Sequence, residues 1–89
     1  MDYRELRSAL VSKGKATEDR RGRHVFYFLD IEGKAYRATK LSHSARGQIS
    51  RNILSSIARQ MRLTVKELKQ FVDCSIERGD WLQLWRERG

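Results

Sequence analysis

The 89-residue sequence has no proline and a single cysteine, Cys74. One cysteine cannot form an intramolecular disulfide, and it excludes a metal site built from several cysteines. The absence of proline argues against a rigid hinge, and no internal repeat or low-complexity segment divides the chain. We therefore expect one folded domain, close to the lower size at which a chain folds without disulfides or metals.

Long apolar runs are also missing. No stretch approaches the roughly 18 consecutive apolar residues of a membrane-spanning helix. The N-terminal segment MDYREL lacks the hydrophobic region of a secretory signal peptide. From these absences and the single cysteine, we expect a protein without membrane contact that stays in the reducing cytoplasm.

Acidic residues are scarce relative to basic ones, because 11 Asp and Glu face 19 Lys and Arg and leave a net charge of +8. Residues 1–47 carry 11 basic and 6 acidic side chains, a net +5, and residues 48–89 carry 8 and 5, a net +3. A charge of roughly 2 to 8 is common for solubility alone, but a compact basic domain also attracts polyanions. Nucleic acid, RNA or DNA, is therefore an expected partner.

The first element is predicted to be a helix. Asp2 and Glu5 are three residues apart, the spacing of a capping box, and apolar residues then recur at helical spacing. These residues are Tyr3, Leu6, Ala9 and Leu10. Lys13 and Gly14 predict the end of the helix, with Gly14 in the left-handed conformation that glycine adopts most easily.

The middle of the chain predicts an antiparallel sheet of two or three strands. Residues 24–31, HVFYFLDI, are rich in β-branched and aromatic residues and are typical of a buried central strand. Glu32-Gly33 predicts a tight turn into the antiparallel partner, residues 34–41. Residues 15–23 are polar and basic, and they contribute at most a short strand that ends in a turn at Arg21-Gly22.

The run Phe26-Tyr27-Phe28 could stack on nucleic-acid bases. Core packing is the favoured interpretation, because a small sheet must bury such a stretch under its helices. Along the partner strand, Arg37 and Thr39 are expected on one face and Ala38 and Lys40 on the other, since strand side chains alternate.

Two further helices are predicted in the C-terminal half. Apolar residues recur at every fourth position of residues 48–61 and mark one face of a helix. They are Ile49, Ile53, Ile57 and Met61. The next helix begins at Thr64, which is spaced from Glu67 as in a capping box, and it ends near Gly79.

Residues 80–89 contain Trp81 and Trp85 and predict either a fourth helix capped by Asp80 or an edge strand. Two exposed tryptophans would form an apolar patch that a soluble monomer rarely tolerates. We therefore expect them to pack against the domain, a partner protein or a second copy of the chain. The element order predicts an α+β fold, α-β-β-β-α with a small antiparallel sheet flanked by helices in residues 1–79 and a helical extension in residues 80–89.

Three segments occur in an order that resembles the HicA family. RELRSALVSKG resembles the family's opening helix and its glycine stop. Gly22-Arg23-His24 before VFYF resembles the Gly-x-His that opens the family's hydrophobic strand, and ILSSIARQMRLTVKELKQF resembles its final helix and the turn after it. The family consists of small toxin endoribonucleases of prokaryotic toxin–antitoxin pairs. The resemblance covers residues 3–71 and implies the family's fold, which is similar to the double-stranded-RNA-binding domain (dsRBD-like).

The sequence departs from the family pattern at several positions. Arg23 occupies a position that is often serine in the family, and Asn52 stands where the final helix usually has glycine. Met61-Arg62 replaces a more usual Ala-Gly, and residues 72–89 have no counterpart in the shortest members. These departures concern the implied activity more than the implied fold.

The resemblance implies a catalytic role for His24. RNA carries its own nucleophile, the 2′-hydroxyl, so cleavage requires a base that accepts that proton and cations that hold the phosphate. Imidazole titrates near neutral pH and serves as either base or acid. The implied reaction needs no metal and no cofactor, and the implied protein partner is a HicB-like antitoxin. Without the resemblance, His24 would be interpreted as the first, half-exposed residue of a strand.

Basic residues near His24 are predicted to bind RNA phosphates. The predicted set comprises Lys13, Lys15, Arg20, Arg21 and Arg23, extended by Arg37 and Lys40 on the partner strand. The first five are offset only by Glu18 and Asp19, which favours phosphate contact over a solvated charge cluster. His43 supplies a second imidazole in the loop after the sheet, where a histidine is more often incidental than functional.

Residues 57–72 also resemble a helix-turn-helix, which would make the chain a DNA-binding module that contacts DNA through Lys66, Lys69 and Gln70. Arg62 stands where such turns prefer glycine, and a three-helix unit leaves the strand hairpin unexplained. Two other functions stay open: an RNA-binding relative without catalysis, and a docking protein that uses the tryptophans of residues 80–89. A homodimer is compatible with each of them.

Overall fold

The computed structural model describes all residues, 1–89. The N-terminal helix α1 (Tyr3–Ser8) continues as a π-helical turn, η1 (Ala9–Lys13). The strands are β1 (Thr17–Arg21), β2 (His24–Ile31) and β3 (Lys34–Ser42), and the later helices are α2 (Arg51–Gln60), α3 (Val65–Val72) and α4 (Arg78–Glu87). The predicted α+β class is confirmed.

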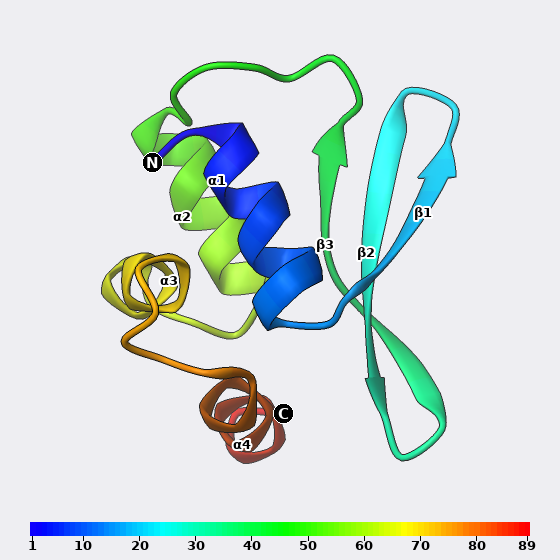
Figure 1. Cartoon of the computed structure of the whole chain (residues 1–89), viewed down its shortest axis with the longest axis vertical. Coiled ribbons are helices and arrows are strands. Elements are labelled where there is room, and N and C mark those ends of the chain that lie inside the picture. The colour runs from blue at the N-terminus through cyan, green and yellow to red at the C-terminus, as the bar shows by residue number, and fades with distance from the viewer.

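The helices lie on one side of a three-stranded antiparallel sheet, and no element covers its other side (Figure 1). The strand order is β1-β2-β3, so the strand predicted to be central is central. Its limits, His24 and Ile31, agree with the prediction, and β3 is one residue longer than predicted. None of the helices combines the length and the apolar character needed to cross a lipid bilayer.

A β-bulge interrupts the pairing of β2 with β3. The register shifts between Tyr27 and Phe28 and leaves Ala38 as the extra residue on β3. Ala38 and Thr39 are consequently both buried, so the strict alternation predicted for this strand is wrong at this point. The buried Thr39 hydroxyl donates a hydrogen bond to Oε1 of Gln60 at 2.7 Å, which ties β3 to α2.

A hydrophobic core of 20 residues fills the space between the sheet and the helices. The sheet contributes alternate residues of β2, among them Tyr27 and Leu29, which are fully buried. Phe71 of α3 and Trp81 of α4 are also fully buried, and their ring centroids lie 5.1 Å apart. One core therefore joins the N-terminal, central and C-terminal segments.

Helix α1 begins as predicted, because Asp2 and Glu5 make both hydrogen bonds of a capping box. The end of the helical segment differs from the prediction: Gly14 is right-handed (φ −75°), and Lys15 takes the left-handed conformation (φ 54°). Glycine is required at position 14 for close packing. A Cβ there would lie 2.8 Å from the Trp81 ring, so only a residue without a side chain lets α4 approach this closely.

Helix α2 is shorter than predicted and begins at Arg51, where the Ser50 side chain caps it. Ile49 precedes the helix and runs along the N-terminus, since its amide donates to the Met1 carbonyl at 3.0 Å. Because Ile49 is not helical, its four-residue spacing to Ile53 does not mark a common helix face. Ile53 is 46% exposed, and its predicted place in the core is wrong.

Helix α3 ends at Val72 and does not extend to Gly79 as predicted. Cys74 has a φ of 79°, which turns the chain. Glu77 and Asp80 then form a new capping box that starts α4, so Gly79 lies in the first turn of α4. Local capping thus divides a segment that was expected to be one helix and a tail.

Helix α4 buries Trp81 and Trp85, with 0% and 5% of their surfaces exposed. The Trp81 indole Nε1 donates to the carbonyl of Met61 at 2.9 Å, which satisfies the buried donor. The expected packing of this segment against the domain is confirmed, and the alternative of an edge strand is wrong. The start of α3 is also as predicted, with the capping box of Thr64 and Glu67 in place.

Candidate nucleic-acid interface

The uncovered face of the sheet brings together residues from all three strands. We call it the outer face, and its central residues are Arg21 of β1, His24, Phe26 and Phe28 of β2, and Arg37 and Lys40 of β3. Phe26 and Phe28 were predicted to pack in the core with Tyr27, and this prediction is wrong for both of them. Consecutive residues on a strand point to opposite faces, and the helices cover only the face that carries Tyr27.

The aromatic side chains of the outer face form a row along β2. The ring centroids of His24 and Phe26 are 6.3 Å apart, and those of Phe26 and Phe28 are 6.4 Å apart with only 24° between the ring planes. Both phenylalanines keep part of their surface exposed. A row of flat apolar groups is therefore open to solvent in the middle of the sheet.

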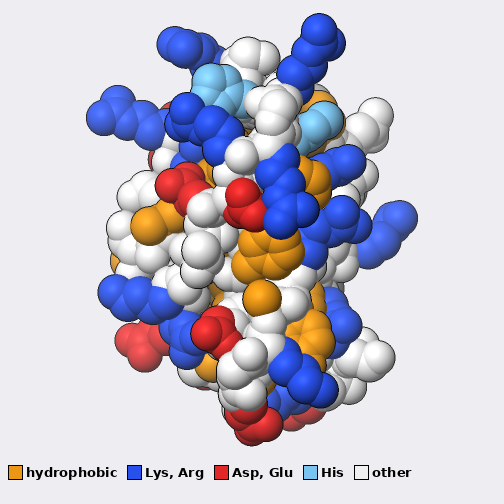
Figure 2. All heavy atoms as spheres, turned by 90° about the vertical axis from the view of Figure 1, so that its right-hand side faces the viewer, with side chains coloured by type: hydrophobic (Ala, Val, Ile, Leu, Met, Phe, Trp, Pro, Cys, Tyr) orange, Lys and Arg blue, Asp and Glu red, His pale blue; other side chains and the backbone are white.

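Cations contact this row from both neighbouring strands. The Arg21 guanidinium lies 5.7 Å from the Phe26 ring centroid and 5.9 Å from that of Phe28. From the opposite side, the Arg37 guanidinium lies 5.8 Å from the Phe26 centroid, and Lys40 pairs directly across from Phe26. Figure 2 shows apolar side chains down the middle of this face with Lys and Arg side chains around them.

Two carboxylates also belong to the outer face. Asp19 forms an ion pair with Arg21 at 2.8 Å, so part of the Arg21 charge is compensated. Asp30 lies at the far end of β2 and, with Phe28 and Arg21, lines a hollow of about 370 Å³. The positive charge on this face that no carboxylate compensates therefore comes from Arg37 and Lys40 and lies around Phe26.

His24 occupies the end of the row, where the sheet meets the β1–β2 turn. It pairs with Arg21 on one side and Ser42 on the other, and its side chain is exposed. The turn itself consists of Gly22 and Arg23, and Gly22 has a φ of 60°, which favours glycine. The imidazole is thus exposed at a strand end that also carries the backbone of Arg21 and Arg23.

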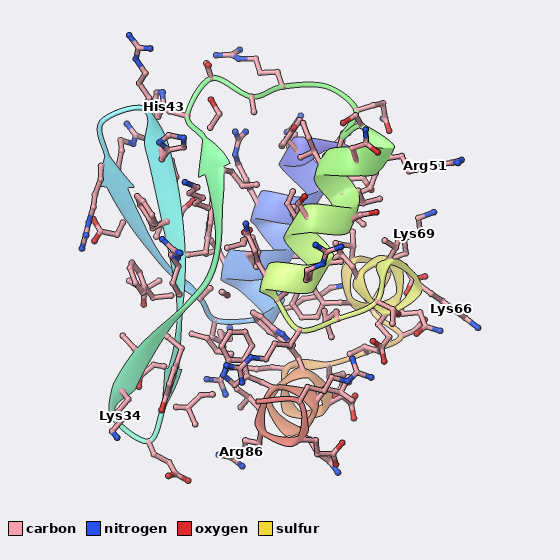
Figure 3. All side chains as sticks on the ribbon, turned by 180° about the vertical axis from the view of Figure 1, so that it is seen from behind. Lys34, His43, Arg51, Lys66, Lys69 and Arg86 are labelled. Carbon is pink, nitrogen blue, oxygen red and sulfur yellow. The ribbon has the colours of Figure 1, made fainter.

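A second cluster lies on the inner side of the same end of the sheet. Arg7, Glu18, Arg20, Val25, Tyr27 and His43 line a cavity of about 390 Å³ there. The Tyr27 hydroxyl donates to Glu18 at 2.8 Å, and burial together with this carboxylate raises the pKa of Tyr27 well above its ordinary value. Figure 3 shows His43 at this end of the sheet. His43, the first residue after β3, therefore lines this cavity, whereas His24 does not.

The structure separates the seven predicted phosphate-binding residues. Arg21, Arg37 and Lys40 share the outer face with His24, and Arg23 lies in the adjoining turn. Arg20 lines the inner cavity. Lys15 is exposed in the connection between η1 and β1.

Lys13 is occupied by a structural contact. Its Nζ donates to the carbonyl oxygens of Phe71 and Val72 at 2.9 and 2.7 Å. The ammonium therefore stabilises the C-terminal end of α3, where partial negative charge accumulates. The Lys13 ammonium therefore lies against α3 and not on the outer face.

Phe26 and Phe28 are the site residues that sequence reasoning did not assign. The signal that identifies them is the period-two pattern of residues 24–31, combined with helices that follow the strands and cover only one face. The aromatic run was recognised, but its division between two faces was not.

Helices α2 and α3 carry a separate basic surface. They are joined by a short turn in which Arg62 has a φ of 60°, and its guanidinium lies 4.0 Å from the Trp85 ring centroid. Lys66 and Lys69 of α3 are exposed, and Figure 3 shows them on the side of the molecule away from the sheet. Two helices joined by a short turn are thus present, on a surface distinct from the outer face.

No group of three or more His, Cys, Asp and Glu side chains is arranged to hold a metal ion. A comparison with protein-family models found no match, and neither did comparisons with curated proteins and with solved structures.

Proposed function

We propose that this chain binds RNA and cleaves it at the His24 end of the outer face. The observation that carries the proposal is the position of His24, whose exposed side chain stands at a strand end next to the backbone of Arg21, its partner on β1, and of Arg23 in the adjoining turn. A residue that can transfer a proton and two residues that can bind phosphate therefore meet at one strand end. The resemblance of residues 3–71 to the HicA endoribonucleases supports the same assignment.

The proposed reaction uses the RNA's own 2′-hydroxyl as the nucleophile. His24 accepts the proton of this hydroxyl as the oxygen attacks the adjacent phosphorus, and the bond to the 5′-oxygen breaks. The products are a 2′,3′-cyclic phosphate and a 5′-hydroxyl, which takes up a proton from imidazolium or water. Arginines beside the phosphate stabilise its developing negative charge. Imidazole suits the proton transfers because it titrates near neutral pH.

Cleavage of an RNA in the presence of a chelator tests this proposal. We expect His24→Ala to lower the cleavage rate by at least about 100-fold, the usual contribution of a general base or acid. His43→Ala is the matched control, since it removes the other histidine, which lines the inner cavity. Cleavage by the His24 variant at the wild-type rate would refute the proposal, as would wild-type protein that cleaves no RNA at any pH tested.

Two protein partners belong to the proposal as well. The HicA resemblance implies a HicB-like antitoxin, and a homodimer is compatible with the exposed edge of β1. Co-expression with the product of a neighbouring reading frame, followed by purification on one partner, tests the first. Sedimentation of the purified chain tests the second.

DNA binding through α2 and α3 is the second candidate function. Exposed Lys66 and Lys69 on the helix that follows a tight turn favour it. Affinity for duplex DNA, compared between wild type and a Lys66→Ala, Lys69→Ala variant, tests this function. A variant with changes at Arg21 and Arg37 is the control, because these residues lie on the outer face.

A further inference from the structure

The outer-face aromatic rings do not serve the core. The 20-residue core lies between the sheet and the helices, and neither Phe26 nor Phe28 belongs to it. Other outer-face positions carry polar side chains, such as Thr17, which pairs with Phe28, and Asp19, which pairs with Phe26. Partly exposed phenyl rings gain less free energy from burial than fully buried ones do. A ligand that covers them would bury the remaining apolar surface.

The charges around the rings indicate what kind of ligand fits. Arg21 and Arg37 contact Phe26 from opposite sides, and Lys40 pairs across from it. Neither Arg37 nor Lys40 takes part in any of the ion pairs of the structure. A ligand that places flat apolar groups on the rings and negative charges on the cations matches this pattern, and nucleic acid has both features.

The spacing of the rings distinguishes unpaired from paired strands. Adjacent centroids lie 6.3 and 6.4 Å apart, whereas successive nucleotides of one strand in a duplex are separated by roughly 3.4 Å. A duplex also hides its base faces inside the stack. Single strands can splay their bases and stack them on aromatic side chains, so the row on β2 suits unpaired bases.

We propose that the outer face is a stacking platform for unpaired nucleic-acid bases, with Phe26 and Phe28 as the stacking residues and Arg21, Arg37 and Lys40 as the phosphate-binding residues. The proposal deepens the proposed function and rests on it in taking RNA as the polymer bound. It specifies a single-stranded substrate, although the resemblance to the double-stranded-RNA-binding fold would imply a duplex. A strand stacked on Phe26 and Phe28 would place its next nucleotide at His24.

Binding of a labelled, unstructured RNA tests the platform. Each 2′-hydroxyl of this RNA is methylated, so it cannot be cleaved through that group and binding is measured apart from catalysis. Phe26→Leu and Phe28→Leu keep apolar side chains on the sheet but remove the rings. We expect each to weaken binding by about tenfold, because base–aromatic stacking contributes roughly 1–3 kcal/mol per base. Ile53→Leu is the control, since it alters an exposed apolar residue on α2.

Phe28→Trp provides a second, independent readout. Trp81 and Trp85 are buried, so the added indole would be the one in reach of a ligand. We expect the fluorescence of this variant to fall when RNA stacks on the added indole. Circular dichroism of each variant shows whether the fold is retained, and Phe28→Trp keeps the test decisive if the leucine variants do not fold.

Duplex RNA and single-stranded DNA of the same sequence complete the comparison. We expect weaker binding of the duplex and similar binding of the DNA strand, since stacking acts on base faces that both single strands expose. Wild-type affinity in the leucine variants, unchanged Phe28→Trp fluorescence, or preference for the duplex would overturn the platform. These results are separate from the cleavage test: a His24→Ala variant that still cleaves refutes the catalytic role and leaves the platform standing.

Discussion

The two faces of the sheet use the same strand in opposite ways. On β2, Tyr27 and Leu29 point into the core and are fully buried, whereas Phe26 and Phe28 point outward and remain partly exposed. The inner face is covered by helices, and the outer face is bordered by arginines and a lysine (Figures 1 and 2). An apolar strand thus supplies both the attachment of the helices and a partly exposed aromatic row, the surface that we propose binds RNA.

The polar groups of the two faces also differ in burial, because the inner one is buried and hydrogen-bonded and the outer one is exposed. On the inner side the Tyr27 hydroxyl donates to Glu18 at 2.8 Å, and burial raises the pKa of Tyr27, so this hydroxyl stays a donor at neutral pH. On the outer side His24 is exposed and borders Arg21. A buried, satisfied polar group stabilises the fold, whereas the exposed imidazole has the solvent access that the proposed proton transfer requires.

Removal of one ring from each face gives the largest contrast that we expect. Tyr27→Ala should lower the free energy of unfolding by about 3–5 kcal/mol, because it deletes a large, fully buried side chain and leaves a cavity. Phe28→Ala should lower it by about 1 kcal/mol or less, since little of the core changes. Urea denaturation measures both values. Equal losses would contradict the division of β2 between two functions.

The next largest loss of stability is expected at Gly14, which packs closely against α3 and α4. Gly14→Ala places a Cβ 2.8 Å from the Trp81 ring and 3.1 Å from the Phe71 ring, and such overpacking costs about 1–3 kcal/mol. Gly79→Ala is the control, because nothing lies within 4 Å of a Cβ at that position, and alanine favours the helix. If the Gly14 variant were as stable as wild type, α4 would be able to move away from position 14 without a loss of unfolding free energy.

Much of the fold follows from local signals. The capping boxes of Asp2 with Glu5 and of Thr64 with Glu67 start α1 and α3 as predicted. The β-branched and aromatic residues of β2, and the turn at Glu32 and Gly33, predict the hairpin within one residue. These features depend on residues that are neighbours in sequence, and therefore they are accessible without a structure.

The features that were missed depend on contacts between distant segments. The need for glycine at position 14 comes from Trp81, 67 residues further along the chain. The place of Phe26 and Phe28 depends on which face the helices cover. For the candidate site, the sequence indicated a histidine and cations, but the aromatic row that joins them required the fold.

The contribution of a single outer-face cation is smaller and is measured through salt. Arg37→Ala removes one guanidinium beside Phe26, and we expect the slope of log affinity against log salt for single-stranded RNA to fall by roughly 0.7 for each phosphate that Arg37 neutralises. Lys34→Ala is the matched control, since Lys34 is exposed at the end of the same strand that lies away from His24 (Figure 3). An equal change in both variants would mean that the charge of the whole molecule, and not the outer face, determines binding.

The smallest expected effect concerns an ion pair on the helix side, far from the outer face. Arg88 donates to both carboxylate oxygens of Glu67, at 2.6 and 2.9 Å. These hydrogen bonds, together with one from the Thr64 backbone, lower the pKa of the Glu67 carboxyl from 4.5 to about 2. The pair joins the start of α3 to the residue that follows α4.

Because the folded protein holds the Glu67 carboxyl ionised to lower pH than the unfolded chain does, the pair stabilises the fold above pH 4.5, and this stabilisation is lost as the pH falls toward 2. We expect Glu67→Gln to lower the free energy of unfolding at neutral pH by about 1 kcal/mol or less, as partly exposed ion pairs do. The difference in unfolding free energy between this variant and wild type should vanish near pH 2. Urea denaturation between neutral pH and about pH 2 measures it. Glu32→Gln is the control, since its contact with Arg86 is 3.5 Å long and its side chain is 83% exposed. If RNA affinity changed along with stability in the Glu67 variant, the helix side and the outer face would not be independent, and the contrast between the two faces would be incomplete.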